Sequence, residues 1–156
     1  MALKEGTKAP EFTAKADGDR EISLSDYKGE WLVLYFYPKD NTSGCTKEAC
    51  GFTENIEEFN KINSKVVGVS PDSVKSHDNF KEKYDLAFDL ISDPEKEIAK
   101  NFEAFGEKKM YGKTYMGIIR STFIIDPEGE IKKVYPKVRV KGHVENVMED
   151  LKELQG

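Results

Sequence analysis

Cysteine, arginine and long apolar runs are all scarce in this chain of 156 residues. No stretch approaches the roughly 18 consecutive apolar residues that a membrane-spanning helix requires, and the first residues lack the apolar region of a secretory signal peptide. We therefore expect a soluble, cytoplasmic protein with no membrane partner. Two cysteines are too few for a disulfide-stapled secreted scaffold, so a bond between them suits catalysis or redox regulation better than architecture.

Blocks of like charge and segment boundaries are missing as well. The 24 basic and 29 acidic residues give a formal net charge of −5, but they are interspersed, so we expect no nucleic-acid partner. No repeat, low-complexity tract or Pro/Ser-rich linker divides the chain. Nine phenylalanines and seven tyrosines argue against disorder, and the sequence predicts a single domain over residues 1–156.

A strand–helix–strand unit is predicted in the first half of the chain. Residues 31–37 are apolar on both faces and end at Pro38, as expected of a central strand covered on both sides. Residues 66–69 form a second such run. Between them, apolar residues recur at spacings of three and four, which places them on one face of a helix; they are Ala49, Phe52, Ile56 and Phe59.

The same alternation continues along the chain. A second helical stripe leads to a short strand over residues 87–91, and Asp93 and Pro94 predict the cap and first turn of a third helix. Residues 121–125 and 131–135 flank a turn sequence and predict a β-hairpin. An amphipathic closing helix follows. The second stripe consists of Val74, His77, Phe80 and Tyr84, and the closing helix carries Val144, Val147, Met148, Leu151 and Leu154.

These elements predict an α/β fold, a thioredoxin-like sandwich with a central mixed sheet and helices on both faces. Cys45 lies between the end of the central strand and a helix that we expect to begin near Thr46. Sites of open α/β sheets lie at such strand ends, and a helix start favours thiolate over thiol. We expect Cys45 to be reactive; the alternative is a buried cysteine that acts as a small apolar residue.

Cys50 lies five residues further along the same predicted helix. In an ideal helix this spacing separates the two Cα atoms by about 8.7 Å, whereas a disulfide tolerates only about 7 Å. A bond between Cys45 and Cys50 would therefore require the helix to unwind locally. The alternative is that Cys50 is an ordinary helix core residue beside Ala49.

The pattern Pro-x-x-x-Thr-x-x-Cys formed by Pro38, Thr42 and Cys45 resembles the active-site motif of the peroxiredoxin family. The spacing to Cys50 is similar to that of its Q subfamily, the bacterioferritin comigratory proteins. One departure is Ser43, where the subfamily often has proline. Residues 6–12, 69–77 and 120–126 resemble further family segments, and the last of these supplies Arg120 as the match to the active-site arginine.

The resemblance implies a thiol-dependent peroxidase without a cofactor. Cys45 would attack hydrogen peroxide or an organic hydroperoxide and become a sulfenic acid, and Cys50 would then form a disulfide with it. Arg120 would supply fixed positive charge, Thr42 hydrogen bonds, and Pro38 shelter from water. Pro38 could also be a simple strand terminator, and Thr42 a helix N-cap. Thioredoxin or a similar dithiol protein would reduce the disulfide, and a monomer is favoured over a dimer.

Two alternative functions on the same fold remain open: a thiol-disulfide oxidoreductase and a redox switch. A thiol-disulfide oxidoreductase usually carries Cys-x-x-Cys, which this chain lacks, and a redox switch on the same fold would need no catalytic arginine. His77 and His143 have no cysteine partners at metal-ligand spacing, so no metal site is predicted. Residues 108–115 are predicted to be a solvated loop, and one hypothesis places Tyr111 and Tyr115 of this loop at the substrate mouth.

Overall fold

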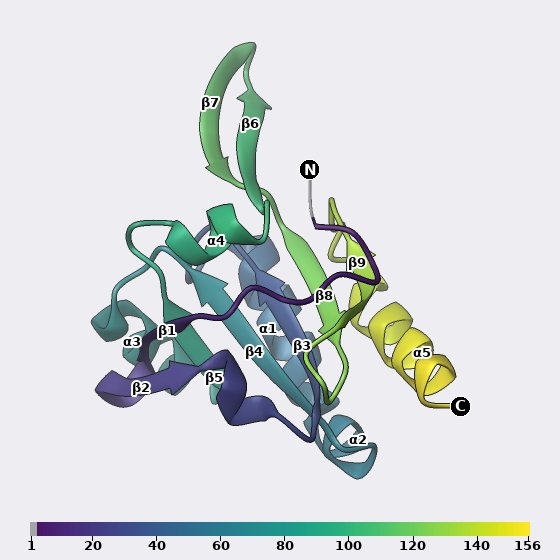
Figure 1. Ribbon diagram of the computed structural model, residues 1–156. Helices are drawn as coiled ribbons and strands as arrows, with labels where there is room; N and C mark the ends of the chain where they lie inside the picture. Colours follow the sequence, from purple (N-terminus) through teal and green to yellow (C-terminus); the bar gives the residue numbers. More distant parts are fainter. Residues whose placement is uncertain (1–2) are drawn as a thin grey trace.

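A seven-stranded sheet in the order β2-β1-β5-β4-β3-β8-β9 forms the centre of the molecule (Figure 1). The structure is a computed structural model and describes residues 3–156. The parallel strands β3, β4 and β5 lie in the middle, and antiparallel strands flank them on both sides. The strands are β1 (Thr13–Ala16), β2 (Arg20–Ser23), β3 (Trp31–Phe36), β4 (Ser64–Ser70), β5 (Asp89–Ser92), β8 (Ser121–Ile125) and β9 (Ile131–Tyr135).

Helices cover both faces of this sheet, as the sequence predicted. Alternate residues of β3 point into two separate apolar clusters because successive side chains of a strand face opposite sides. Leu32, Leu34 and Phe36 join the cluster beneath α4, whereas Val33 and Tyr35 join the cluster beneath the remaining helices. The helices are α1 (Ser43–Glu54), α2 (Ile56–Lys61), α3 (Val74–Tyr84), α4 (Glu97–Asn101) and α5 (His143–Gln155), with short 3₁₀ turns at Asp17–Asp19 and Leu24–Tyr27.

The helix after β3 departs from its prediction at both ends. It begins at Ser43 rather than near Thr46, so Cys45 lies within its first turn. The apolar stripe that follows belongs to two helices, because the backbone leaves the helical conformation at Asn55 (φ −105°, ψ 10°). The Asn55 side-chain amide donates to the carbonyl of Gly51 at 2.9 Å. Asparagine competes with the backbone for hydrogen bonds in this way, which accounts for the break.

The third predicted helix begins later than expected. Residues 93–96 form a turn, and α4 begins at Glu97 because Lys96 adopts a left-handed conformation (φ 60°). Pro94 is therefore not in the first helical turn. Asp93 still acts as a cap, since its carboxylate accepts hydrogen bonds from the N–H groups of Ile98 and Ala99 at 3.3 and 3.0 Å. The strands β4 and β5, the β8–β9 hairpin, α3 and α5 confirm the predicted elements.

Residues 108–115 are not a loop, which corrects that prediction. They belong to a two-stranded hairpin of β6 (Phe105–Met110) and β7 (Lys113–Ile118) that projects from the body of the protein (Figure 1). Tyr111 and Gly112 form its turn with φ values of 53° and 75°, as a tight two-residue hairpin requires. Apolar, charged and glycine residues are mixed along both strands in the sequence, so no regular apolar alternation marked them. Within residues 3–156, no helix is long and apolar enough to cross a membrane.

Gly68 of β4 offers a test of this packing. A Cβ atom at Gly68 would lie 2.9 Å from Cζ of the fully buried Tyr35 and 3.1 Å from Leu90 Cδ2. Gly68→Ala is expected to lower the free energy of unfolding by about 1–3 kcal/mol, measured by urea denaturation. Gly117→Ala is the control, because its new Cβ would meet only flexible side chains of Lys108 and Tyr115 at 3.3 Å. Equal losses for both variants would contradict the prediction.

Candidate active site

Cys45 lies in the first turn of the helix that follows the central strand β3. Residues 37–42 connect β3 to α1, and Cys45 is the third residue of α1, with 1% of its surface exposed. Cys45 and Cys50 are both free thiols. The backbone N–H groups of a first helical turn have no helical partners and carry positive partial charge, which favours a thiolate at this position.

Arg120 reaches this cysteine across 75 positions of sequence. It immediately precedes β8, which runs antiparallel to β3 with Ser121 opposite Phe36, so it lies at the carboxyl end of β3. Its Nη2 donates a hydrogen bond to Cys45 Sγ at 3.1 Å. A Cβ atom at Gly44 would lie 3.3 Å from the same nitrogen, so a glycine before the cysteine leaves room for the guanidinium. The structure thus brings these two predicted residues into contact.

Glu48 is a site residue that the sequence reasoning missed. It lies one helical turn after Cys45, is fully buried, and accepts a hydrogen bond from Arg120 Nη1 at its Oε1 atom at 2.6 Å. Burial raises the pKa of Glu48 to about 7, although the Arg120 charge acts in the opposite direction. The sequence held one clue to this role. Glu48 lies on the helix face that carries Cys45, Ala49 and Phe52, and a charged residue on a buried face needs a partner.

A neutral histidine lies behind this glutamate. His143 Nε2 shares a hydrogen bond of 2.8 Å with Thr122 Oγ1 and lies 4.0 Å from Glu48 Oε2. Burial and then the Arg120 charge lower the pKa of His143 to about 4. The imidazole is therefore uncharged at neutral pH and supplies no positive charge to Glu48; the positive charge in contact with Glu48 is that of Arg120.

Pro38 and Thr42 belong to the connection that precedes Cys45. Pro38 is half-buried and Thr42 is exposed. Thr42 occupies the N-cap position of α1, but its side chain makes no capping hydrogen bond. Instead its Oγ1 donates to the carbonyl of Lys39 at 2.8 Å, which stabilises the turn of the connection itself. The capping alternative is correct for the backbone position of Thr42 and wrong for its hydroxyl.

Cys50 lies within the second turn of α1 and is half-buried against the apolar cluster beneath that helix. Burial, and then the charge of Glu54, raise the pKa of the Cys50 thiol. The next residue, Gly51, packs closely on α5, since a Cβ atom there would lie 3.0 Å from Val144 Cγ2. The two cysteines thus share one continuous helix, and of the two it is Cys45 whose sulfur accepts a hydrogen bond from Arg120.

A cavity of about 590 Å³ opens beside Arg120. Its wall is predominantly basic, and the strand β6 supplies Lys108 and Lys109 to it. Burial and the nearby Arg120 charge lower the pKa of Lys108. Tyr111 and Tyr115 are exposed and are not among the residues that line this cavity. The remaining lining residues are Glu107, Ile119, Lys137, Val138 and Arg139.

Comparison with known proteins gives a consistent assignment. Residues 6–134 match the AhpC/TSA family. The chain is 48% identical over 154 residues to Peroxiredoxin Bcp of Bacillus subtilis, covering 99% of this chain and 98% of the relative. A structure of the Xanthomonas campestris bacterioferritin comigratory protein, described by its alkyl peroxide reduction activity, matches with a TM-score of 0.89 and 43% identity over 93% of this chain and 92% of that one. A Xylella fastidiosa PrxQ mutant structure matches with a TM-score of 0.94 and 40% identity over 100% and 99% of the two chains.

The buried carboxyl of Glu48 predicts a pH-dependent stability. Because the folded-state pKa of about 7 lies above the ordinary value of 4.5 for a glutamate, between these two pH values the folded protein holds a proton that the unfolded chain has lost. The stability that this proton provides is complete below pH 4.5 and is lost as pH rises through 7. Glu48→Gln cannot ionise, so relative to the native protein it should gain about 2–3 kcal/mol of unfolding free energy between pH 5 and pH 8.

Urea denaturation at both pH values measures this difference. The control is Glu54→Gln on the same helix, at an exposed position, which should show no such gain. A Glu48→Gln variant whose stability follows the native protein in parallel from pH 5 to pH 8 would show that the buried carboxyl is ionised throughout.

Proposed function

We infer that Cys45 is the residue that attacks the peroxide. The chain belongs to the AhpC/TSA family and is a peroxiredoxin, that is, a thiol-dependent peroxidase. The observation that carries this assignment is the hydrogen bond of 3.1 Å from Arg120 Nη2 to Cys45 Sγ. A fixed guanidinium charge at that distance stabilises a thiolate, which is the nucleophilic form of cysteine. The substrates that we propose are hydrogen peroxide and organic hydroperoxides.

The first step transfers one oxygen to sulfur. The Cys45 thiolate attacks the terminal oxygen of the hydroperoxide and the O–O bond breaks, so that sulfur becomes a sulfenic acid. The other oxygen leaves as an alkoxide, or as hydroxide from hydrogen peroxide, and takes up a proton to become an alcohol or water. Arg120 stabilises the negative charge as it passes from sulfur to the leaving oxygen.

Thr42 and Pro38 have supporting roles in this proposal. The Thr42 hydroxyl already donates to the Lys39 carbonyl, so its two lone pairs remain free to accept a hydrogen bond from the peroxide. Pro38 has no N–H group and is half-buried at the end of β3, where it limits access of water to the thiolate. Both residues lie in the connection that leads directly to Cys45.

The second step joins the two cysteines. The Cys50 thiol attacks the sulfenic sulfur, a disulfide forms, and the sulfenic oxygen leaves as water. An intact α1 holds the two Cα atoms about 8.7 Å apart, which exceeds the disulfide limit of about 7 Å. The first turns of α1 must therefore unwind before the bond can close. The unwinding also exposes the disulfide to an external reductant.

The partner that we propose is thioredoxin or a similar dithiol protein. One thiolate of the dithiol attacks the Cys45–Cys50 disulfide, and the second displaces it, which returns both cysteines to thiols and leaves the partner oxidised. Since both cysteines lie in one chain, the cycle requires no second subunit, which supports a monomer as the working unit. A cytoplasmic location suits this dependence on a reducing partner.

The decisive experiment follows both thiols through one turnover. Reduced protein is mixed with one equivalent of hydrogen peroxide, and free thiols and intact mass are measured for the native chain and for Cys50→Ser. The native chain should lose both thiols and two hydrogens, whereas Cys50→Ser should gain one oxygen at Cys45 that dimedone traps. If Cys45 reacts while native Cys50 stays reduced, the resolving assignment fails; if neither cysteine reacts, the peroxidase assignment fails.

The role of Arg120 predicts a further loss of rate. Arg120→Lys keeps a positive charge, but one ammonium nitrogen replaces the two planar guanidinium nitrogens that donate separately to Cys45 and Glu48. The second-order rate constant for sulfenic acid formation should fall by about tenfold or more. Arg139→Lys is the matched control, since Arg139 is exposed on the wall of the same cavity. A rate within twofold of native for Arg120→Lys would refute the role of the fork.

A further inference from the structure

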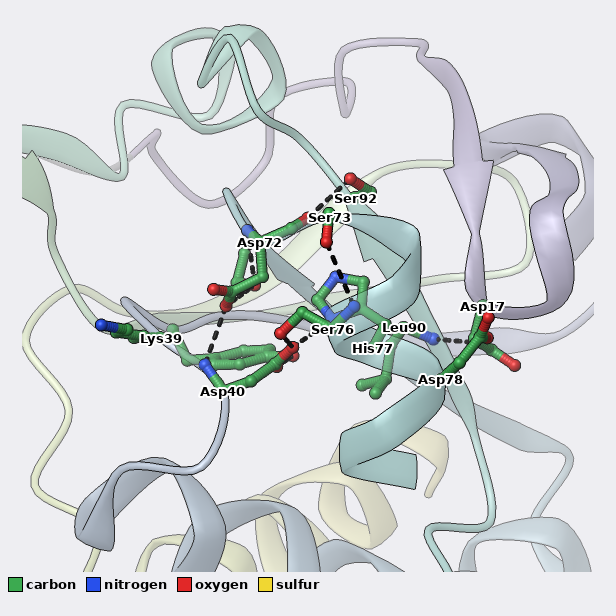
Figure 2. Close-up of polar contacts among 12 residues, drawn as sticks. Asp17, Lys39, Asp40, Asp72, Ser73, Ser76, His77, Asp78, Leu90 and Ser92 are labelled. Atoms are coloured by element: carbon green, nitrogen blue, oxygen red, sulfur yellow. Dashed lines mark hydrogen bonds and ion pairs between the residues drawn. The ribbon is translucent and has the colours of Figure 1, made fainter. Parts of the chain in front are cut away.

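A buried ion pair ties the connection before the active-site helix to α3. Asp40, in the middle of that connection, is 5% exposed, and His77 of α3 is fully buried. His77 Nδ1 lies 2.7 Å from Asp40 Oδ2. Figure 2 shows the two side chains pointing toward each other between the connection and the helix. Neither residue contacts Cys45 or Arg120 in the structure, so neither is part of the reacting group.

The second nitrogen of His77 identifies the protonation state of this pair. His77 Nε2 lies 2.9 Å from the carbonyl oxygen of Ile91 on β5. A carbonyl only accepts hydrogen bonds, so Nε2 carries a hydrogen. The short contact at Nδ1 then requires a second proton between imidazole and carboxylate, and the raised pKa of His77 favours this proton on the imidazole. Burial acts to lower the pKa of His77, but the hydrogen bond and charge of Asp40 outweigh it and raise that pKa.

Asp40 is held from three further directions. Its Oδ1 accepts from the Tyr37 hydroxyl at 2.6 Å, and its Oδ2 also accepts from Ser76 Oγ at 2.8 Å. The backbone N–H of Asp40 donates to Asp72 Oδ2 at 2.8 Å, and Ser70 Oγ donates to the same oxygen at 2.7 Å. The connection is therefore fixed through its main chain and its side chain to the end of β3, to the segment after β4, and to α3.

The group is complete without a metal ion. Ligand atoms of Asp40, Asp72 and His77 lie within 4.8 Å of one another, which is a spacing that could hold a cation. However, His77 Nδ1 and Asp40 Oδ2 already share a proton, and Asp72 Oδ2 already accepts two hydrogen bonds. A cation would have to displace these bonds, so the cluster serves as an anchor rather than as a metal site.

We propose that Asp40 and His77 are positioning residues for the peroxidase reaction, which hold the connection before α1 still while α1 itself unwinds. The inference rests on the proposed function. Asp40 lies two residues before Thr42 and three before Ser43, the first residue of α1. With Asp40 fixed, Pro38 and the end of β3 stay in place while α1 unwinds. It also returns Thr42 to one position each time the helix re-forms.

This role predicts a split between the two steps of the cycle. Attack on the peroxide requires Thr42 and Cys45 to be aligned, so it depends on the anchor. Closure of the Cys45–Cys50 disulfide requires only that α1 unwinds, so it does not. Loss of the anchor should slow sulfenic acid formation and leave the rate of disulfide formation unchanged or faster.

Two substitutions of His77 separate the anchor from core packing. In His77→Asn the side-chain amide occupies the place of Nδ1 and can still donate to Asp40, but it cannot reach Ile91. In His77→Gln the amide occupies the place of Nε2 and can still donate to the Ile91 carbonyl, but it loses Asp40. His77→Gln should lower the second-order rate constant for hydrogen peroxide by about ten- to a hundredfold, whereas His77→Asn should remain within about threefold of native.

Two further variants on α3 distinguish the loss of the anchor from a general loss of stability. Lys81 of the same helix forms an ion pair with Asp17 at 2.8 Å, away from the connection, so Lys81→Gln should leave both rate constants unchanged. Ser76→Ala removes one hydrogen bond to Asp40 Oδ2 at a half-buried position and should lower the peroxide rate constant in the same direction as His77→Gln. Rapid-quench alkylation and mass spectrometry measure the two steps separately.

The charge on His77 adds a pH signature. Because the folded-state pKa of His77 is raised, the stabilisation that its charge provides is present below the ordinary imidazole value and is lost as pH rises through the raised value. Asp40 and Asp72 are the ionised groups that face it, with the Tyr37 hydroxyl on Asp40. The ratio of native to His77→Gln rate constants should therefore be largest at low pH and approach one at alkaline pH.

The outcomes distinguish failure of the inference from failure of the function. Native protein that does not consume peroxide would refute the proposed function itself. A normal native rate with equal losses in His77→Gln and His77→Asn, or with a ratio that is independent of pH, would show that His77 only fills the core. A normal native rate with an unchanged His77→Gln rate would refute the positioning role outright.

Discussion

The site depends on one guanidinium that serves two acidic groups. Arg120 donates one nitrogen to Cys45 Sγ and another to Glu48 Oε1, and both acceptors are buried. Two anions and one cation in an apolar setting are costly, because each charge loses its hydration. Burial resolves the conflict by keeping Glu48 largely protonated up to about pH 7. Under those conditions the positive charge of Arg120 is available to the sulfur, while the neutral carboxyl still fixes the orientation of the guanidinium.

The order of strands in the sheet makes this contact possible. Because β8 lies antiparallel beside β3, the residue that enters β8 meets the residues that leave β3, although 75 positions separate Arg120 from Cys45. The parallel neighbour β4 also contributes from its carboxyl end. Asp72, in the segment that follows β4, accepts a hydrogen bond from the backbone N–H of Asp40. The ends of β3 and β4 therefore fix a connection that has no regular structure of its own, and the start of β8 supplies the arginine that bonds the first turns of α1.

Much of this arrangement could be predicted from the sequence, and the exceptions have physical reasons. The central strands were continuous apolar runs and α3 carried an apolar stripe; Cys45 lay in a motif of known spacing, and Arg120 in a second segment that resembles the family. Glu48 was missed because a glutamate in a helix is usually solvated, and only the arrangement of β8 reveals its partner. Asp40 was missed because an aspartate in a connection is usually solvated, and its partner His77 lies 37 positions away on α3. The β6–β7 hairpin was missed because its strands mix apolar, charged and glycine residues without the regular alternation that marks a strand.

Gly51 lowers the intrinsic stability of α1, which bears on how such a chain could adapt to heat. Glycine within a helix lowers its stability by about 1 kcal/mol relative to alanine, yet here the absent side chain also admits Val144 of α5 at close range. In the cycle proposed above, α1 melts once per turnover, so strengthening this helix would slow formation of the disulfide. Selection for thermal tolerance would therefore act on the sheet, on the anchored connection and on the far end of α5, and would leave α1 weak. Stability and turnover compete in this chain at one helix rather than throughout the fold.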